Sequence, residues 1–173
     1  MTPGLWHRID LLARQLTPLM LTLVLVIISV VPMRILDFST VVPLLPLMSV
    51  YHWAIFRPRL LPAYAVFLIG ILQDILTGAP VGVNALVLLL VYGAVLSQKG
   101  FFMDKSFFIL WLGFSLIAAG AAGLNWLAVS ILNVAIVEIH TAVFQYLLSL
   151  GIFPAVAWVF MRWQRAFLED RLT

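Results

Sequence analysis

Six apolar runs, separated by short polar connections, make up most of this chain. They cover residues 18–33, 41–56, 60–77, 83–98, 106–131 and 141–163. A helix needs roughly 20 apolar residues, within about 17 to 25, to cross the hydrocarbon core of a bilayer. Hydrophobic residues make up 64% of the chain and charged residues 10%, far from the balance of soluble domains. The sequence therefore predicts an all-α integral membrane protein with six transmembrane helices.

The limits of two runs are open. The run at 41–56 is short and carries Pro43 and Pro46, and the segment 132–140 either extends the fifth helix or lies flat on the membrane surface. The first run follows a basic leader, as in a signal peptide, but no small-residue cleavage site follows it, so we interpret it as an uncleaved helix. No linker divides the chain. We expect one domain over 1–173, with a cytoplasmic leader, 1–16, and a cytoplasmic tail, 164–173.

Lys and Arg side chains fall in short clusters between the runs, and cytoplasmic loops are enriched in both. With six spans, nine of the ten basic residues lie on one side of the membrane: Arg8, Arg14, Arg57, Arg59, Lys99, Lys105, Arg162, Arg165 and Arg171. Only Arg34 lies on the other side. Removing one span would scramble this pattern, which therefore favours an even number of spans with both termini in the cytoplasm.

A polar stripe interrupts the third run. Gly70, Gln73, Asp74, Thr77 and Gly78 fall at i, i+3, i+4, i+7 and i+8, on one helical face. Such a face should turn toward protein rather than lipid. Asp74 is the only acid inside a predicted span, and an intramembrane acid is a functional hypothesis by default. Because Asp74 lies near the outer end of its helix, we favour a structural anchor, held by Thr77, Gly78 and the amides of the next turn.

The segment 78–82 is predicted to form a tight external turn between the third and fourth helices. Gly78 suits the left-handed position that ends a helix, and Pro80 cannot continue one. Gly82 can adopt a positive φ. Asn84 is the expected N-cap of the fourth helix. The four residues together predict a compact helical hairpin with Asp74 available to pin the turn or a partner.

Small residues line one face of the fifth run. Ser115, Ala119 and Gly123 are spaced by four, and Gly120 lies beside them. Small residues at this spacing let helices approach each other closely. We favour internal packing within the bundle over a groove for a partner helix.

Other polar and aromatic residues have ordinary explanations. His52 lies beside Tyr51 and Trp53, near the cytoplasmic end of the second run, where an interfacial aromatic belt accounts for all three. Glu138 and His140 are too few for a metal site, and a proton relay would need a deeper partner. A solvated outer loop is the favoured interpretation of this pair.

Two asparagines and three tryptophans remain inside or near the later runs. Asn125 and Asn133 are expected to form hydrogen bonds across helices. Trp126, Trp158 and Trp163 are interpreted as interface or packing residues.

The stretch FRPRLLPAYAVFLIGILQDILTGAPVGVNAL resembles the rod shape-determining protein MreD family. The residues that carry the resemblance are Arg57, Pro58, Gly70, Asp74, Gly78, Val81, Gly82 and Val83. Pro154 in the last run and the basic tail with Arg162 and Arg165 also fit. No acid stands beside Gly151, where some relatives carry one, which removes support for a second acid in the sixth helix.

The resemblance implies a fold and a role. Such proteins resemble the substrate-binding subunits of energy-coupling-factor transporters, with six helices in the bacterial inner membrane. They are non-catalytic parts of the cell-elongation machinery that supports peptidoglycan synthesis along the side wall. The implied partners are an MreC-type single-span scaffold protein, RodA with its class B penicillin-binding transpeptidase, and MreB, indirectly or through cytoplasmic loops. No cofactor and no nucleic acid is expected.

Two other classes of function remain for comparison. A small-molecule-binding subunit of an uptake transporter needs several polar groups that converge at mid-depth, whereas Asp74 stands near one end of its helix. An intramembrane enzyme is least favoured, because no paired aspartates, Ser–Lys or His-x-x-Glu-His arrangement is present. The chain also has no cysteine, which excludes disulfides, thiolate metal sites and cysteine nucleophiles.

Overall fold

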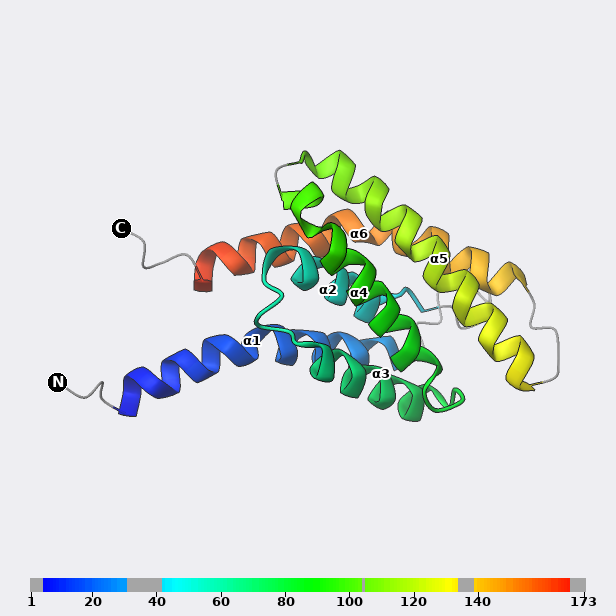
Figure 1. The fold of residues 1–173 in the computed structure, drawn as a ribbon, viewed down its shortest axis with the longest axis horizontal. Coiled ribbons are helices and arrows are strands. Elements are labelled where there is room, and N and C mark those ends of the chain that lie inside the picture. Colours follow the sequence, from blue (N-terminus) through cyan, green and yellow to red (C-terminus); the bar gives the residue numbers. More distant parts are fainter. Residues whose placement is uncertain (1–4, 31–41, 104, 134–138, 169–173) are drawn as a thin grey trace.

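A computed structural model describes residues 5–30, 42–103, 105–133 and 139–168 as an all-helical protein. Its helices are α1 (Leu5–Val30), α2 (Leu45–Phe56), α3 (Ala63–Thr77), α4 (Val83–Met103), α5 (Phe107–Asn133) and α6 (Ile139–Leu168). Each predicted span corresponds to one of these helices, so the all-α fold is confirmed (Figure 1).

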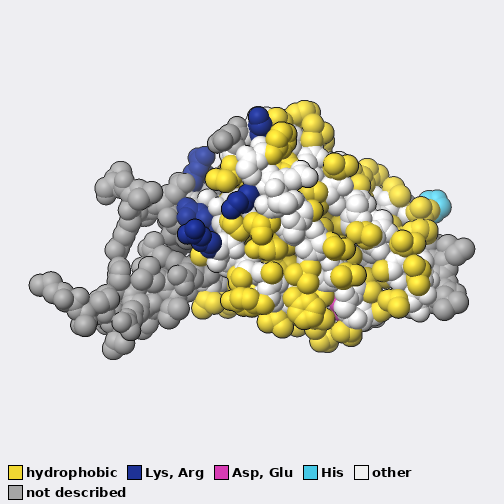
Figure 2. Space-filling view, in the orientation of Figure 1, with side chains coloured by type: hydrophobic (Ala, Val, Ile, Leu, Met, Phe, Trp, Pro, Cys, Tyr) yellow, Lys and Arg dark blue, Asp and Glu magenta, His cyan; other side chains and the backbone are white. Residues whose placement is uncertain are grey.

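Three stretches of helix are long and apolar enough to cross a bilayer: Val83–Met103, Phe107–Leu132 and Ile139–Arg165. The apolar parts of the other three helices are shorter than a full crossing. Large apolar side chains nevertheless cover much of the surface, as Figure 2 shows. A membrane protein accounts for this surface, because lipid rather than water then contacts it.

The short helix α2 forms the centre of the bundle. It contacts α1, α4, α5 and α6, and every residue from Leu45 to Ile55 is buried. Its 12 residues extend only about 18 Å. The helix begins after Pro43, with Pro46 in its first turn, where a missing N–H costs little. The prediction of a helix over 41–56 is therefore too long at its start.

Two polar contacts fix α2 to its neighbours. The hydroxyls of Thr22 in α1 and Ser49 in α2 lie 2.7 Å apart and form a hydrogen bond. The Tyr51 hydroxyl donates to the Leu110 carbonyl oxygen of α5 at 2.9 Å. Both pairs are buried, so α2 is positioned by directional bonds as well as by apolar packing.

The prediction of an aromatic belt around His52 is wrong. Tyr51, His52 and Trp53 are 1%, 3% and 0% exposed. The Tyr51 ring forms T-shaped contacts with Phe114 and Phe153, with centroids 5.5 and 5.8 Å away. These residues belong to the core because α2 is covered on all sides by other helices.

Several helices extend further than the apolar runs. α1 begins at Leu5, so most of the predicted leader is helical, and α6 reaches Leu168 rather than ending near residue 163. The apolar count misses these turns because a helix can continue through polar residues once it leaves the hydrocarbon core. α5 ends at Asn133, and residues 134–138, including Glu138, lie outside the described part of the chain.

Positive charge gathers at one end of the protein. The Lys and Arg side chains visible in Figure 2 lie at the end where α1 begins and α6 ends in Figure 1. The basic side chains that the structure describes are Arg57, Arg59, Lys99, Lys105, Arg162 and Arg165.

Candidate functional site

The α3–α4 turn has the backbone that its glycines predict. Gly78 follows the last residue of α3 with a φ of 68°, and Gly82 precedes α4 with a φ of 104°. L-residues rarely adopt such values, whereas glycine does so without steric cost. Gly78 is thus the left-handed end of α3, and Gly82 lets the chain re-enter a helix directly.

Asp74 closes this turn through its carboxylate. Its side chain is 0% exposed. Oδ2 accepts a hydrogen bond from the Gly82 amide at 2.7 Å. Oδ1 accepts from the Asn84 amide at 3.0 Å and from the Asn84 side-chain nitrogen at 2.8 Å. The amides belong to the N-terminus of α4, where a negative charge is favourable, so Asp74 caps α4 from α3.

The predicted cap at Asn84 is wrong. α4 begins at Val83, so Asn84 lies inside its first turn, and Asp74 accepts the amide bonds that a cap would accept. The Asn84 side chain instead bridges two helices, because its oxygen accepts a bond from the Asn125 side-chain nitrogen at 3.0 Å. A polar chain, Asp74–Asn84–Asn125, therefore joins α3, α4 and α5. The expected cross-helix bond of Asn125 is confirmed; the side chain of Asn133 lies outside the described residues.

The predicted inward stripe of α3 is correct only in part. Gly70 and Asp74 are buried, Gln73 is half-buried, and Thr77 and Gly78 are exposed. Thr77 donates to the Gln73 carbonyl oxygen at 2.8 Å, within its own helix, rather than to the Asp74 carboxylate.

Gly70 sets the distance between α3 and α4. A Cβ added at Gly70 would lie 2.2 Å from the Cα atom and 2.7 Å from the backbone nitrogen of Ala85. No carbon contact is stable at that separation. The two helices therefore cross so closely here that only glycine fits, which holds the backbone of α4 near Asp74.

A small void lies beside the polar chain. Gln73, Asn84 and Asn125 are among its lining residues, and its volume is about 20 Å³. The side-chain oxygen of Gln73 is buried with no hydrogen-bond partner in the part of the chain that is described. A space of this size with several polar groups accommodates about one water molecule.

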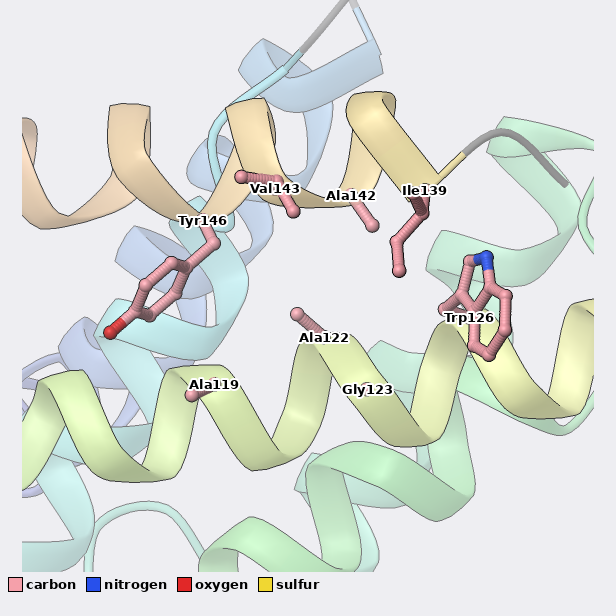
Figure 3. Close-up of a pocket in the computed structure, with 8 residues that line it drawn as sticks. All are labelled: Ala119, Ala122, Gly123, Trp126, Ile139, Ala142, Val143 and Tyr146. Atoms are coloured by element: carbon pink, nitrogen blue, oxygen red, sulfur yellow. The ribbon is translucent and has the colours of Figure 1, made fainter.

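A second feature is an apolar groove between α5 and α6, with a volume of about 210 Å³. Figure 3 shows Ala119, Ala122 and Gly123 of α5 on one side and Ala142 and Tyr146 of α6 on the other. The small side chains of both helices leave this space open. We call it the α5–α6 groove.

The groove changes the interpretation of the small-residue face of α5. Ser115 does pack internally, since its hydroxyl lies 2.8 Å from the Tyr146 hydroxyl. Ala119, Gly120 and Gly123 are exposed, and a Cβ added at Gly120 or Gly123 would meet no atom within 4 Å. Internal packing, the favoured prediction, is thus wrong for these three residues. The groove alternative remains for Ala119 and Gly123, whereas Gly120 is not among the described lining residues.

Among the described residues, most polar groups of the two regions bond to one another or to the backbone. Both Asp74 oxygens are occupied by N–H donors. Within the described residues, no group of three or more His, Cys, Asp or Glu side chains is placed to hold a metal ion. His140 is exposed at the start of α6. Asp74 and its hydrogen-bond partners can hold α3, α4 and α5 together, and α5 and α6 can present an apolar groove.

Comparison with known protein families gives one finding. The family described as rod shape-determining protein MreD matches residues 10–170, which is nearly the whole chain and includes both the Asp74 turn and the α5–α6 groove. No curated protein sequence and no solved structure matches. A match of this extent is a property of the whole domain rather than of one motif, and the chain belongs to the MreD family of rod shape-determining proteins.

Proposed function

We propose that this protein is a non-catalytic component of the bacterial cell-elongation machinery. It binds an MreC-type single-span scaffold protein in the inner membrane and supports peptidoglycan synthesis along the side wall. RodA and its class B transpeptidase work beside it, and MreB acts indirectly or through the cytoplasmic loops. The observation that carries this role is the family match over residues 10–170.

The proposed topology has six spans, both termini in the cytoplasm and a helix arrangement like that of energy-coupling-factor substrate-binding subunits. In support, α1 begins and α6 ends at the end where the visible basic side chains gather, as cytoplasmic ends do. The short helix α2 contacts protein on all sides, so it needs no full lipid-facing length. The shorter lipid-exposed helices are compatible with a locally thinner bilayer.

The α5–α6 groove is the proposed binding site for the scaffold's transmembrane helix. Its described lining is apolar apart from the Tyr146 hydroxyl and the Trp126 indole nitrogen. The groove lies between two helices long enough to cross the membrane. Helix association in lipid depends on close packing, which small interface residues permit. Gly123, exposed and without a neighbour within 4 Å of an added Cβ, leaves room for a partner's backbone.

We expect Gly123→Leu to weaken this complex. The substituted side chain would fill the groove, and overpacking of about 1–3 kcal/mol corresponds to a loss of roughly fivefold to 150-fold in affinity. The measurement is recovery of the chain with a tagged MreC-type partner after co-expression and purification in detergent. Size-exclusion chromatography confirms that each variant remains folded.

Gly93→Leu is the matched control, because Gly93 on α4 is also exposed with no neighbour near an added Cβ. Its recovery should stay within about twofold of wild type, as for most surface changes. Equal losses in both variants would place the contact outside the groove. No complex with the unaltered chain would count against the proposed role itself.

The alternative, a small-molecule uptake subunit, has no comparable support. The polar void beside Gln73 has a volume of about 20 Å³, whereas pockets for small organic ligands measure about 300–1,000 Å³.

A further inference from the structure

The C-terminal part of α6 carries a mixed basic and aromatic face. Trp158, Met161, Arg162 and Arg165 fall at i, i+3, i+4 and i+7 and line one hollow of about 340 Å³. Trp158 is 57% exposed, and both arginines are exposed. The Arg162 guanidinium carbon lies 5.3 Å from the centre of the Trp158 ring, so a cation–π contact holds it against the indole.

The two arginines have no anionic partner in the described part of the chain. The only acidic side chain described there is Asp74, which lies buried near the end of α3 and already accepts three hydrogen bonds. The Lys and Arg side chains visible in Figure 2 gather at the end of the protein where α6 ends in Figure 1. The described side chains that line the hollow therefore carry positive charge, which an anion would neutralise.

The order of groups along α6 matches the layers of a membrane surface. The apolar stretch of α6 ends at Arg165, Val159 beside Trp158 is 47% exposed, and the arginines follow toward the terminus. Apolar surface, then an indole, then guanidinium groups correspond to acyl chains, the interface and lipid phosphates. A soluble acidic protein would meet the arginines but would have no reason to contact a tryptophan at interfacial depth.

We propose that this face binds an anionic phospholipid of the surrounding leaflet. Arg162 and Arg165 donate hydrogen bonds to the headgroup phosphate, because guanidinium groups pair with phosphate oxygens in a fork geometry. Trp158 and Met161 contact the glycerol region and the first acyl carbons. The site would hold the end of α6 at a defined depth and favour contact with anionic lipid over zwitterionic lipid.

The test is native mass spectrometry of the purified full chain in detergent with equal amounts of phosphatidylglycerol and phosphatidylcholine. The unaltered protein should retain phosphatidylglycerol preferentially. The double variant Arg162→Gln/Arg165→Gln should lose most of that preference, by roughly fivefold for each guanidinium, since a basic side chain near anionic lipid contributes about 1 kcal/mol.

The matched control is Arg59→Gln/Lys99→Gln, which removes the same charge from exposed residues outside the hollow. This variant should keep the preference. The proposal is overturned if the unaltered chain shows no preference, if the α6 double variant keeps it, or if the control loses it equally. Millimolar inorganic phosphate should leave the lipid bound; displacement by phosphate would identify a simple anion site instead.

Discussion

Asp74→Ala is expected to lower the free energy of unfolding by about 3 kcal/mol, since each buried donor left without an acceptor costs about 1–3 kcal/mol. The change leaves the Gly82 amide and two Asn84 donors unpaired at the start of α4. The free energy can be measured by denaturant titration in mixed micelles. Fluorescence is a suitable signal, because Trp53 is fully buried in the folded protein.

Two further variants separate the contributions of this residue. Asp74→Asn retains one acceptor oxygen, so its loss of stability should be smaller than that of Asp74→Ala. Thr77→Ala is the control: Thr77 is exposed and bonds only within α3, so its effect should stay within about 0.5 kcal/mol. Unaltered stability of Asp74→Ala would contradict the capping role.

A structural role for Asp74 also has a cellular consequence. In rod-shaped cells that depend on this protein, Asp74→Asn should preserve rod shape when the amount of folded protein matches wild type. Cell width and length measured by microscopy decide the matter. Rounded cells at matched abundance would mean that the charge itself takes part in a further step.

The α3–α4 hairpin was largely predictable because its determinants are local. Gly78 and Gly82 have the positive φ values that their positions in the turn required. The amides that satisfy Asp74 come from the next turn, as expected. The sequence analysis missed that Asn84 donates hydrogen bonds to Asp74 rather than capping α4. Sequence alone cannot reveal that a carboxylate ten positions earlier, on another helix, takes the place of the cap. Asn125, a polar residue in an otherwise apolar run, was the available signal that a third residue joins Asp74 and Asn84 in the polar chain.

The burial of α2 was not predictable from periodicity. In a soluble helix, polar residues mark the outward face. In this chain apolar residues surround every helix, so a side that contacts lipid and a side that contacts protein look alike. Tyr51, His52 and Trp53 have the composition of an interfacial belt, and only the contacts of α2 with four other helices identify them as core.

The same ambiguity affected the small residues. Gly70 and Gly123 both belong to helix faces that carry other small residues. The structure distinguishes them by their neighbours: Ala85 touches the backbone at Gly70, whereas no atom comes near Gly123. A helix neighbour and its distance decide whether a small residue closes a crossing or opens a groove, and neither quantity is encoded in the spacing itself.

Gly70→Ala is expected to destabilise the protein by about 3 kcal/mol, at the upper end of typical overpacking costs. The added Cβ would overlap the Ala85 Cα and backbone nitrogen, so relief requires the backbones of α3 and α4 to separate. That movement would also strain the bonds from Asp74 to the start of α4. Denaturant titration in mixed micelles measures the effect.

Gly120→Ala is the matched comparison, and its expected effect on stability has the opposite sign. Both glycines are helical, and alanine is favoured over glycine inside a helix by about 0.5–1 kcal/mol. Gly120 has open space around an added Cβ, so this variant should be as stable as wild type or more so. Adding Ala85→Gly to Gly70→Ala should restore little stability, because the closest contacts at 2.2 and 2.7 Å are to backbone atoms that remain. Full rescue by Ala85→Gly, or a Gly70→Ala variant as stable as Gly120→Ala, would show that α3 and α4 cross less closely than described.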